Sequence, residues 1–293
     1  MTAVAATGAH SGRRFFFANE RTAYWLMVAP AAVLMAAFYF YPLVEVLWIS
    51  VTEPKPGLDN YALLFTSASI RRTIVTTLRI CTITTAVTIV LGYVVAYVLV
   101  HASPRAQRWL FLGVLVPLWI SVLVRAFAWV TLLAREGLIN TTLRDAGIIE
   151  QPLALIWNEF GIVIGMVHYM IPYAVLPLYA SMRDIDARTV SAARGLGGSR
   201  FYTFRRVFLP QSLPGIIGAT VLVFIFSLGF FVTPAILGGG KTLMIAEYIS
   251  LQILDLLRWG LGTMLASTLV IFIFVLLAAL AKVVDLKRLF GAG

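Results

Sequence analysis

Six long apolar stretches follow one another along the chain, and short polar segments that carry nearly all of the charge separate them. The stretches span about 22–47, 74–100, 109–133, 160–182, 212–237 and 259–284. An α-helix needs about 20 apolar residues to cross a bilayer core of about 30 Å, so each stretch predicts a membrane-spanning helix. The expected fold is therefore all-α, a polytopic membrane protein with six transmembrane helices.

Composition supports this class of protein. Of the 293 residues, 60% are hydrophobic and 12% are charged, whereas soluble domains carry about 25% charged residues. In a soluble protein the net charge of +10 would suggest a nucleic-acid partner. Here membrane topology explains the charge, so we expect a lipid bilayer and no nucleic acid. One cysteine, Cys81, and three scattered histidines give no metal-ligand spacing, so no metal site is expected.

The Lys and Arg residues fall unevenly on the two sides of the predicted membrane. Fourteen lie on the side of the two chain ends, against seven on the other. Because loops rich in Lys and Arg stay in the cytoplasm, both ends are predicted to be cytoplasmic. Residues 1–21 then form a cytoplasmic tail, with the Phe15–Phe17 patch near the lipid, and residues 22–290 form the transmembrane domain.

The segment 183–211, here called the knob, lies between the fourth and fifth stretches and contains six arginines, so it cannot rest in hydrocarbon. Residues 186–194 can form a short helix that the following glycines stop. Ser199 suits the cap of a second helix over 200–208, and Pro210 is expected to end it. The pattern predicts a helix–turn–helix on the cytoplasmic surface.

At these residues the chain resembles the coupling loop, known as the EAA loop, of ABC importer permeases of type I. The resemblance rests on the alanine pair, a glycine four residues later and an aliphatic-x-Leu-Pro run. It implies an ATPase-coupling surface made of Ser191, Ala192, Ala193, Gly197, Val207, Leu209 and Pro210. The family usually has Glu where this chain has Ser191, and the effect of that replacement stays open.

Further stretches at 116–129, 165–182 and 226–239 resemble permeases of spermidine/putrescine importers. This resemblance implies a multi-pass protein of the bacterial inner membrane that is not itself an enzyme. It implies a second permease in a heterodimer, a dimer of cytoplasmic ATPases that bind ATP and Mg, and an extracytoplasmic solute-binding protein. No cofactor is expected in this chain. A polyamine is the expected solute, and another small organic or inorganic solute is the alternative.

Arg125 is a charge inside the third stretch, so it should face protein or a water-filled cavity. It lines the translocation path in one interpretation; in the other it bonds carbonyls freed by Pro117, or the second permease. His168 in the fourth stretch either bonds backbone opened by Pro172 or is a polar path residue. Tyr169, Tyr173 and Phe230 can also line the route, since aromatic rings hold organic cations, although most aromatics in spans only pack.

Other candidate chemistry finds little support. The run 238–242 (GGGKT) resembles the end of a phosphate-binding loop, but Ala235 occupies the position of the first glycine and the run follows a predicted helix. We therefore expect a glycine hinge there. Ser227, Thr233 and Ser267 lack a readable histidine–carboxylate partner, so no catalytic residue is expected. An ion-coupled secondary transporter is a more distant alternative, because the spans contain no paired carboxylates.

Overall fold

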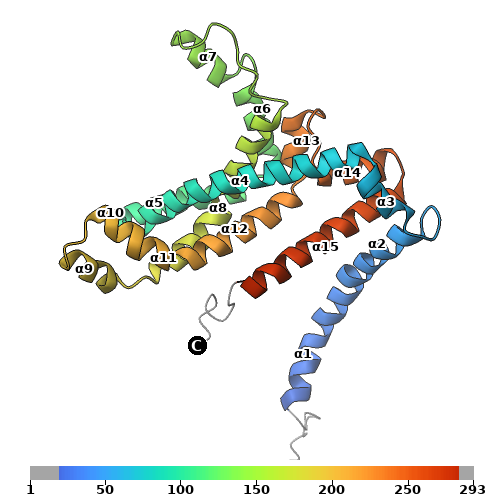
Figure 1. Ribbon diagram of the computed structural model, residues 1–293, viewed down its shortest axis with the longest axis horizontal. Helices are drawn as coiled ribbons and strands as arrows, with labels where there is room; N and C mark the ends of the chain where they lie inside the picture. The colour runs from blue at the N-terminus through green and yellow to red at the C-terminus, as the bar shows by residue number, and fades with distance from the viewer. Residues whose placement is uncertain (1–19, 284–293) are drawn as a thin grey trace, which may run out of the picture.

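The computed structural model describes residues 20–283, and every regular element in this range is a helix (Figure 1). The all-α prediction is therefore confirmed. Most of the predicted cytoplasmic tail, including Phe15–Phe17, and the basic residues Lys287 and Arg288 lie outside the described residues.

Three helices form the central bundle: α4 (Ala68–His101), α8 (Glu159–Arg183) and α12 (Leu213–Leu228). They lie side by side in Figure 1. The buried face of α4 carries small and threonine side chains at helical spacing, including Thr84, Thr88, Gly92 and Ala96. A Cβ atom on Gly92 would come within 2.9 Å of Ala174 on α8. Small residues therefore bring the helix backbones close together, as is common in membranes.

The first predicted span is one continuous helix built from α1 (Glu20–Met35), η1 (Ala36–Phe40) and α2 (Tyr41–Thr52). Pro30 and Pro42 in this stretch are expected to kink or end a helix, but the helix ends at neither of them: Pro30 lies inside α1 and Pro42 in the first turn of α2. The π-helical turn η1 ends at Phe40, two residues before Pro42, and the Tyr41 amide there donates to the Ala36 carbonyl. A widened turn of this kind tolerates a proline that cannot donate the next hydrogen bond. Residues 24–40 are exposed in this chain, and α2 packs against α15 (Trp259–Val283).

The third predicted span, 109–133, is broken, which corrects the expectation of one helix. It consists of α5 (Pro104–Trp119) and α6 (Val122–Leu133), and a short loop leads from α6 to α7 (Leu138–Asp145). The segment 122–145 lies at 101° to α5. Pro117 removes an amide donor from the last turn of α5, and Ile120 then adopts an extended conformation. In Figure 1, α6 and α7 turn away from the central bundle.

The fifth predicted span, 212–237, is also broken. It contains α12 and the short α13 (Val232–Gly238), and the chain leaves the helix between them at residues 229–231. Gly239 and Gly240 then form a turn with positive φ angles of 58° and 71°, which glycine adopts without strain; the glycine hinge expected at 238–242 stays a prediction. Gly165 on α8 packs so closely on α13 that a Cβ atom there would meet Thr233 and Leu237.

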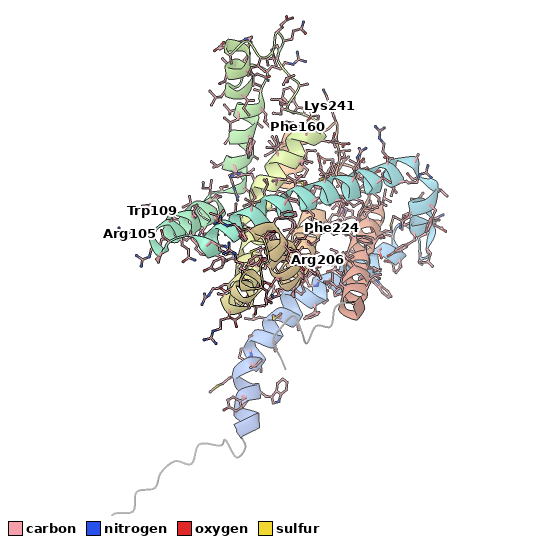
Figure 2. All side chains as sticks on the ribbon, turned by 60° about the vertical axis from the view of Figure 1, so that its left-hand side comes forward. Arg105, Trp109, Phe160, Arg206, Phe224 and Lys241 are labelled. Carbon is pink, nitrogen blue, oxygen red and sulfur yellow. The ribbon has the colours of Figure 1, made fainter. Side chains whose placement is uncertain are left out.

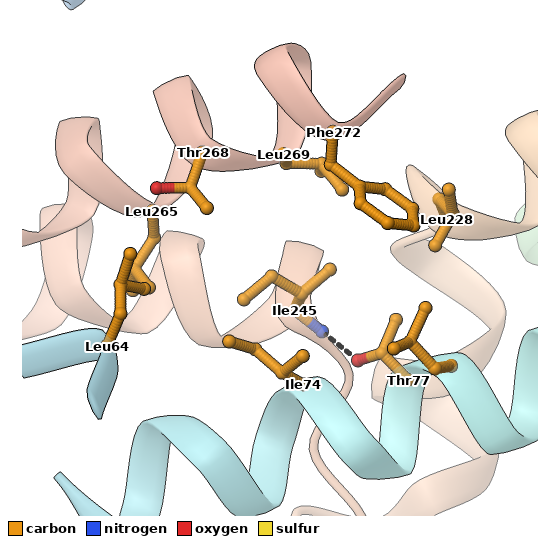
Figure 3. Close-up of a pocket in the computed structure, with 10 residues that line it drawn as sticks. Leu64, Ile74, Thr77, Leu228, Ile245, Leu265, Thr268, Leu269 and Phe272 are labelled. Carbon is orange, nitrogen blue, oxygen red and sulfur yellow. Dashed lines mark hydrogen bonds between the residues drawn. The ribbon is translucent and has the colours of Figure 1, made fainter. Parts of the chain in front are cut away.

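A cluster of short helices closes the end of the molecule opposite the knob. It contains α3 (Asp59–Thr66), α14 (Ile245–Ser250) and η3 (Leu251–Asp255). Figure 3 shows the Ile245 amide donating to the Thr77 hydroxyl over 2.8 Å, which attaches α14 to α4 beside an apolar cavity of about 100 Å³.

The described residues contain four unbroken helices long and apolar enough to span a membrane, and two bent helix pairs that can each form one more. The four unbroken helices coincide with the first, second, fourth and sixth predicted spans. The described residues therefore offer four to six crossings, and the six predicted spans require each bent pair to form one. The second bent pair, residues 200–228, begins inside the knob and overlaps only part of the fifth predicted span.

Candidate functional site

The knob is a pair of capped helices. Asp186 caps α9 (Ala187–Gly195) by accepting the Arg188 amide over 2.8 Å. Ser199 caps α10 (Arg200–Thr203) by accepting the Tyr202 amide over 3.1 Å. Both caps satisfy amides that the first helical turn leaves without a partner. The helix–turn–helix predicted for the knob is therefore confirmed.

The turn between the two helices is set by Gly197 and Gly198. Gly197 has φ +89°, a left-handed conformation that glycine adopts without strain. The Gly198 amide donates to the Ala193 carbonyl over 3.1 Å, and the Gly197 amide donates to the Arg194 carbonyl over 3.0 Å. This pair of bonds is the Schellman arrangement that ends many helices. The turn at the end of α9 therefore explains why a glycine occupies position 197 of the coupling loop.

Pro210 does not end the second helix, which corrects our expectation. From α10 the chain continues through the π-helical turn η2 (Phe204–Phe208) and α11 (Leu209–Gln211) before it bends by 60° into α12. Proline lacks an amide proton, and in the π-helical turn the Leu209 amide bonds the Phe204 carbonyl instead of the usual partner. Pro210 thus sits in the first turn of α11, where its missing donor is tolerated.

The seven predicted coupling residues occupy two surfaces of the knob. Ser191, Ala192, Gly197 and Pro210 are exposed, whereas Ala193, Val207 and Leu209 are half-buried. Ser191 lines a cavity of about 650 Å³ between the knob and the ends of α4, α5 and α8. Arg183, Arg194 and His101 line the same cavity, and no carboxylate does. The serine therefore faces a cationic space where the family's glutamate would carry a negative charge.

An aromatic cluster anchors the knob to α4, and the sequence analysis missed it. Phe208 is 6% exposed, and its ring centroid lies 5.3 Å from that of Tyr97. Phe204 lies edge-to-face with Tyr97 at 5.6 Å and with Tyr93 at 6.2 Å. The aromatic pairs recur four residues apart on both segments, a spacing that could have indicated two facing helix surfaces.

Three large apolar side chains on the knob face outward. Leu196 is 91% exposed, Phe201 72% and Tyr202 56%. They surround the glycine turn and stand among the knob arginines, of which Arg206 is labelled in Figure 2. A polar segment with exposed aromatic and aliphatic side chains at its tip is typical of an interaction surface.

The five predicted path residues lie close to one another on α6, α8 and the break after α12. Arg125 on α6 places its Cζ atom 4.3 Å from the ring centroid of Tyr169 on α8. Tyr169 stacks on Tyr173 at 5.7 Å and meets Phe230 at 4.6 Å. Tyr169, Tyr173 and Phe230 line a cavity of about 300 Å³. The structure therefore unites side chains from α6, α8 and the break after α12.

His168 adjoins this group through a side-chain bond. Its Nδ1 atom accepts the indole N–H of Trp129 over 3.2 Å. One of the two interpretations of His168 was a hydrogen bond to the backbone opened by Pro172. In the described structure its hydrogen-bond partner is the Trp129 side chain instead. This bond ties α8 to α6 directly beside Arg125.

At the opposite end from the knob, charged residues gather around the start of α8. Arg79, at the start of the second predicted span, forms an ion pair with Glu159. Arg72, Arg79, Glu159 and Lys241 line a polar cavity of about 240 Å³. Figure 2 shows Lys241 near Phe160 and apart from Arg105 and Trp109 on α5. The loops that contain Arg72 and Lys241, which the charge pattern predicts on the same side of the membrane, therefore lie next to each other in the structure.

Glu247 on α14 is a half-buried carboxylate near this end. Its Oε2 atom is buried without a hydrogen-bond partner. Burial raises the pKa of its carboxyl above the ordinary value of 4.5, against a smaller opposing effect of a backbone bond from Met244. In the described residues no three His, Cys, Asp or Glu side chains are grouped to hold a metal ion.

The chain matches known transport proteins. Residues 88–288 match the family model described as "Binding-protein-dependent transport system inner membrane component". The spermidine/putrescine transport system permease protein of Haemophilus influenzae is 30% identical over 75% of this chain and 77% of its own length. The corresponding protein of Escherichia coli (strain K12) is 32% identical over 73% of this chain and 78% of its own length.

Solved structures show the same fold. A bacterial alginate ABC transporter, solved with a periplasmic protein bound to an alginate pentasaccharide, contains a chain that superposes with a TM-score of 0.73. At 16% identity, the superposition covers 90% of this chain and 95% of that one. The fold and the sequence matches agree with the multi-pass helices, and the chain belongs to the family of inner membrane components of binding-protein-dependent transport systems.

Proposed function

We propose that this chain is the permease subunit of an ATP-driven importer for polyamines such as spermidine and putrescine. The observation that carries the proposal is the similarity, at about 30% identity over three quarters of the chain, to spermidine/putrescine permeases. An aromatic-lined cavity between α8 and the end of α12 supports it, because aromatic faces attract alkylammonium groups. A 27% identical permease for trehalose keeps another small solute as the alternative.

The knob is the proposed docking site for a cytoplasmic ATPase that binds ATP and Mg. Its exposed Leu196, Phe201 and Tyr202 offer apolar contact area, and its arginines offer charge. Phe204 and Phe208 join the knob to α4, so a displacement of the knob is transmitted to the bundle. ATP binding then moves the knob, and the bundle alternates between two open states.

A second permease and a solute-binding protein complete the proposed assembly. The exposed apolar faces of α1, η1 and α15 can meet lipid or that second permease, expected to be a different chain. The knob and both ends lie in the cytoplasm, and the solute-binding protein meets the side of Arg72, Glu159 and Lys241. Arg125, His168, Tyr169, Tyr173 and Phe230 line the route of the solute.

Reconstitution tests this function. The chain is purified with its ATPase and second permease, placed in proteoliposomes and supplied with the solute-binding protein. Uptake of labelled putrescine should require ATP and the binding protein. Uptake driven by an ion gradient without ATP would support a secondary transporter instead. Uptake of a sugar with no response to putrescine or spermidine would remove the polyamine assignment and retain the importer.

A further inference from the structure

Arg125 occupies an aromatic face that a cationic solute would need. Its side chain is 8% exposed, and its guanidinium lies over the ring of Tyr169 with Cζ 4.3 Å from the centroid. A cation over a tyrosine ring is attracted by the negative face of the ring. This contact has the chemistry expected for an alkylammonium group in the same place, but here the protein supplies the cation.

The contact with Tyr169 holds the guanidinium without a counter-ion from the described chain. The Arg125 Nε and Nη1 atoms are buried and have no hydrogen-bond partner, and the ion pair found within residues 20–283 joins Arg79 to Glu159. A buried charge normally needs a paired carboxylate and several hydrogen bonds. Because Arg125 lacks both, moving its head group away from Tyr169 breaks few polar bonds.

The cavity beside Tyr169 has the dimensions and surface for an alkylammonium. It measures about 300 Å³ and is lined by Tyr169, Tyr173, Phe226 and Phe230. The Tyr173 and Phe226 rings meet at 5.1 Å, and Tyr169 and Phe230 meet at 4.6 Å. The lining contains no carboxylate. Aromatic rings are therefore the feature of this lining that can attract a cation. The ring of Tyr169 is shared between the cavity and Arg125, which lies over that ring from α6 and is not itself part of the lining.

We propose that Arg125 is a tethered competitor of the solute. Its guanidinium covers Tyr169 when no solute is bound, and an arriving ammonium group must displace it. Two cations cannot share one ring at this depth, because repulsion between like charges is strong where water is scarce. Arg125 thus closes the empty route to passive flow of polyamine, and the ATP-driven change of state releases it. This proposal rests on the proposed polyamine function.

Flux without ATP tests the proposal. The complete transporter is placed in proteoliposomes, and labelled putrescine is followed down its own gradient in the absence of nucleotide. Arg125→Gln removes the competing cation, so passive flux should rise roughly tenfold, within the range expected for one cation–π contact. Arg125→Lys keeps a cation and should stay near wild type. Arg105→Gln, which removes an exposed arginine at the start of α5, is the matched control and should change nothing.

Each result supports or overturns the inference. Passive flux through Arg125→Gln equal to wild type, with ATP-driven uptake intact, overturns it and leaves the polyamine function standing. Equal flux through the Gln and Lys variants overturns it too, because charge would then not be the cause. A wild-type transporter that takes up no polyamine overturns both proposals. If Arg125→Gln does not co-purify with its partners, Arg125→Met, of similar length and without charge, takes its place.

Discussion

Gly197 is the residue whose backbone fixes the direction of the knob tip. Its φ of +89° costs an L residue about 1–2 kcal/mol. Gly197→Ala should therefore weaken ATPase retention and ATP-driven uptake by up to roughly tenfold, while the chain still inserts in the membrane. Gly195→Ala is the matched control, because Gly195 ends α9 with open space around it and alanine favours helix. Co-purified ATPase and uptake are measured; equal values for both variants would contradict the prediction.

Glu247 provides a prediction about pH. Its carboxyl pKa is raised by burial, so ionising it disfavours the folded state. The resulting loss of stability is absent below the ordinary pKa of 4.5, grows as pH rises through the raised folded pKa, and is constant above it. Glu247→Gln removes this loss.

The Glu247→Gln variant should accordingly show a higher Tm than wild type at pH 8, and the difference should shrink as pH falls toward 4.5. Thermal unfolding of the detergent-solubilised complex at a series of pH values measures it. Glu136→Gln, on the loop between α6 and α7, serves as the exposed control. A Tm difference independent of pH would show that ionisation of Glu247 is not responsible.

At the scale of elements, the knob carries two aromatic surfaces with separate roles. Phe208 is buried against α4, and Phe201 points outward. Phe208→Ala should remove about 3–5 kcal/mol of packing that joins the knob to the bundle. ATP hydrolysis should then continue without solute uptake, because the ATPase still binds a knob that no longer moves the helices.

Phe201→Ala should have the opposite pattern: the ATPase is lost during purification while the permease itself keeps its Tm. ATPase activity, uptake and subunit recovery are measured side by side for both variants. Loss of the ATPase from Phe208→Ala with full retention by Phe201→Ala would reverse the roles assigned to the two surfaces.

The hydrophobic pattern predicts where helices lie better than where they break. Long apolar stretches located the spans, because crossing a bilayer requires backbone groups to bond within a helix. The breaks at Ile120 and after Leu228 leave hydropathy unchanged, so the pattern could not reveal them. The expectation that Pro210 ends the helix was wrong because a π-helical turn tolerates its missing amide donor. The first and last residues of that turn, Phe204 and Phe208, both pack on Tyr97 of α4, a contact that the hydrophobic pattern does not show.

In the candidate site, too, the sequence predicts the local features and misses the contacts between distant segments. Local rules predicted the Asp186 and Ser199 caps and the glycine turn, because each depends on bonds within a few residues. The contact of Arg125 with Tyr169 joins two helices distant in sequence. The position of Arg125 inside an apolar stretch predicted only that the guanidinium faces protein or a water-filled cavity. The identity of its neighbour, Tyr169, follows from the 101° bend that sets the direction of α6.

At the scale of the whole molecule, one continuous packed region connects the knob to the aromatic cavity. The cluster that buries Phe208 also contains Met170 and Ala174 of α8, and Tyr169, Tyr173 and Phe230 pack against it. Tightly packed interiors transmit displacements because they deform little. A push on the knob therefore has a direct physical connection to the ring that Arg125 covers.

The orientation of this connection is the remaining prediction at this scale. The charge distribution predicts that the knob lies in the cytoplasm and Lys241 outside. The native Cys81 is fully buried, so labelling of an introduced cysteine has little background. A membrane-impermeant maleimide should label Lys241→Cys in right-side-out vesicles and Ser191→Cys only in inside-out vesicles. Both positions are accessible, since Lys241 and Ser191 are exposed in the described structure. Labelling of Ser191→Cys from outside would exclude a cytoplasmic ATPase at the knob, and with it the proposed coupling between ATP hydrolysis and transport.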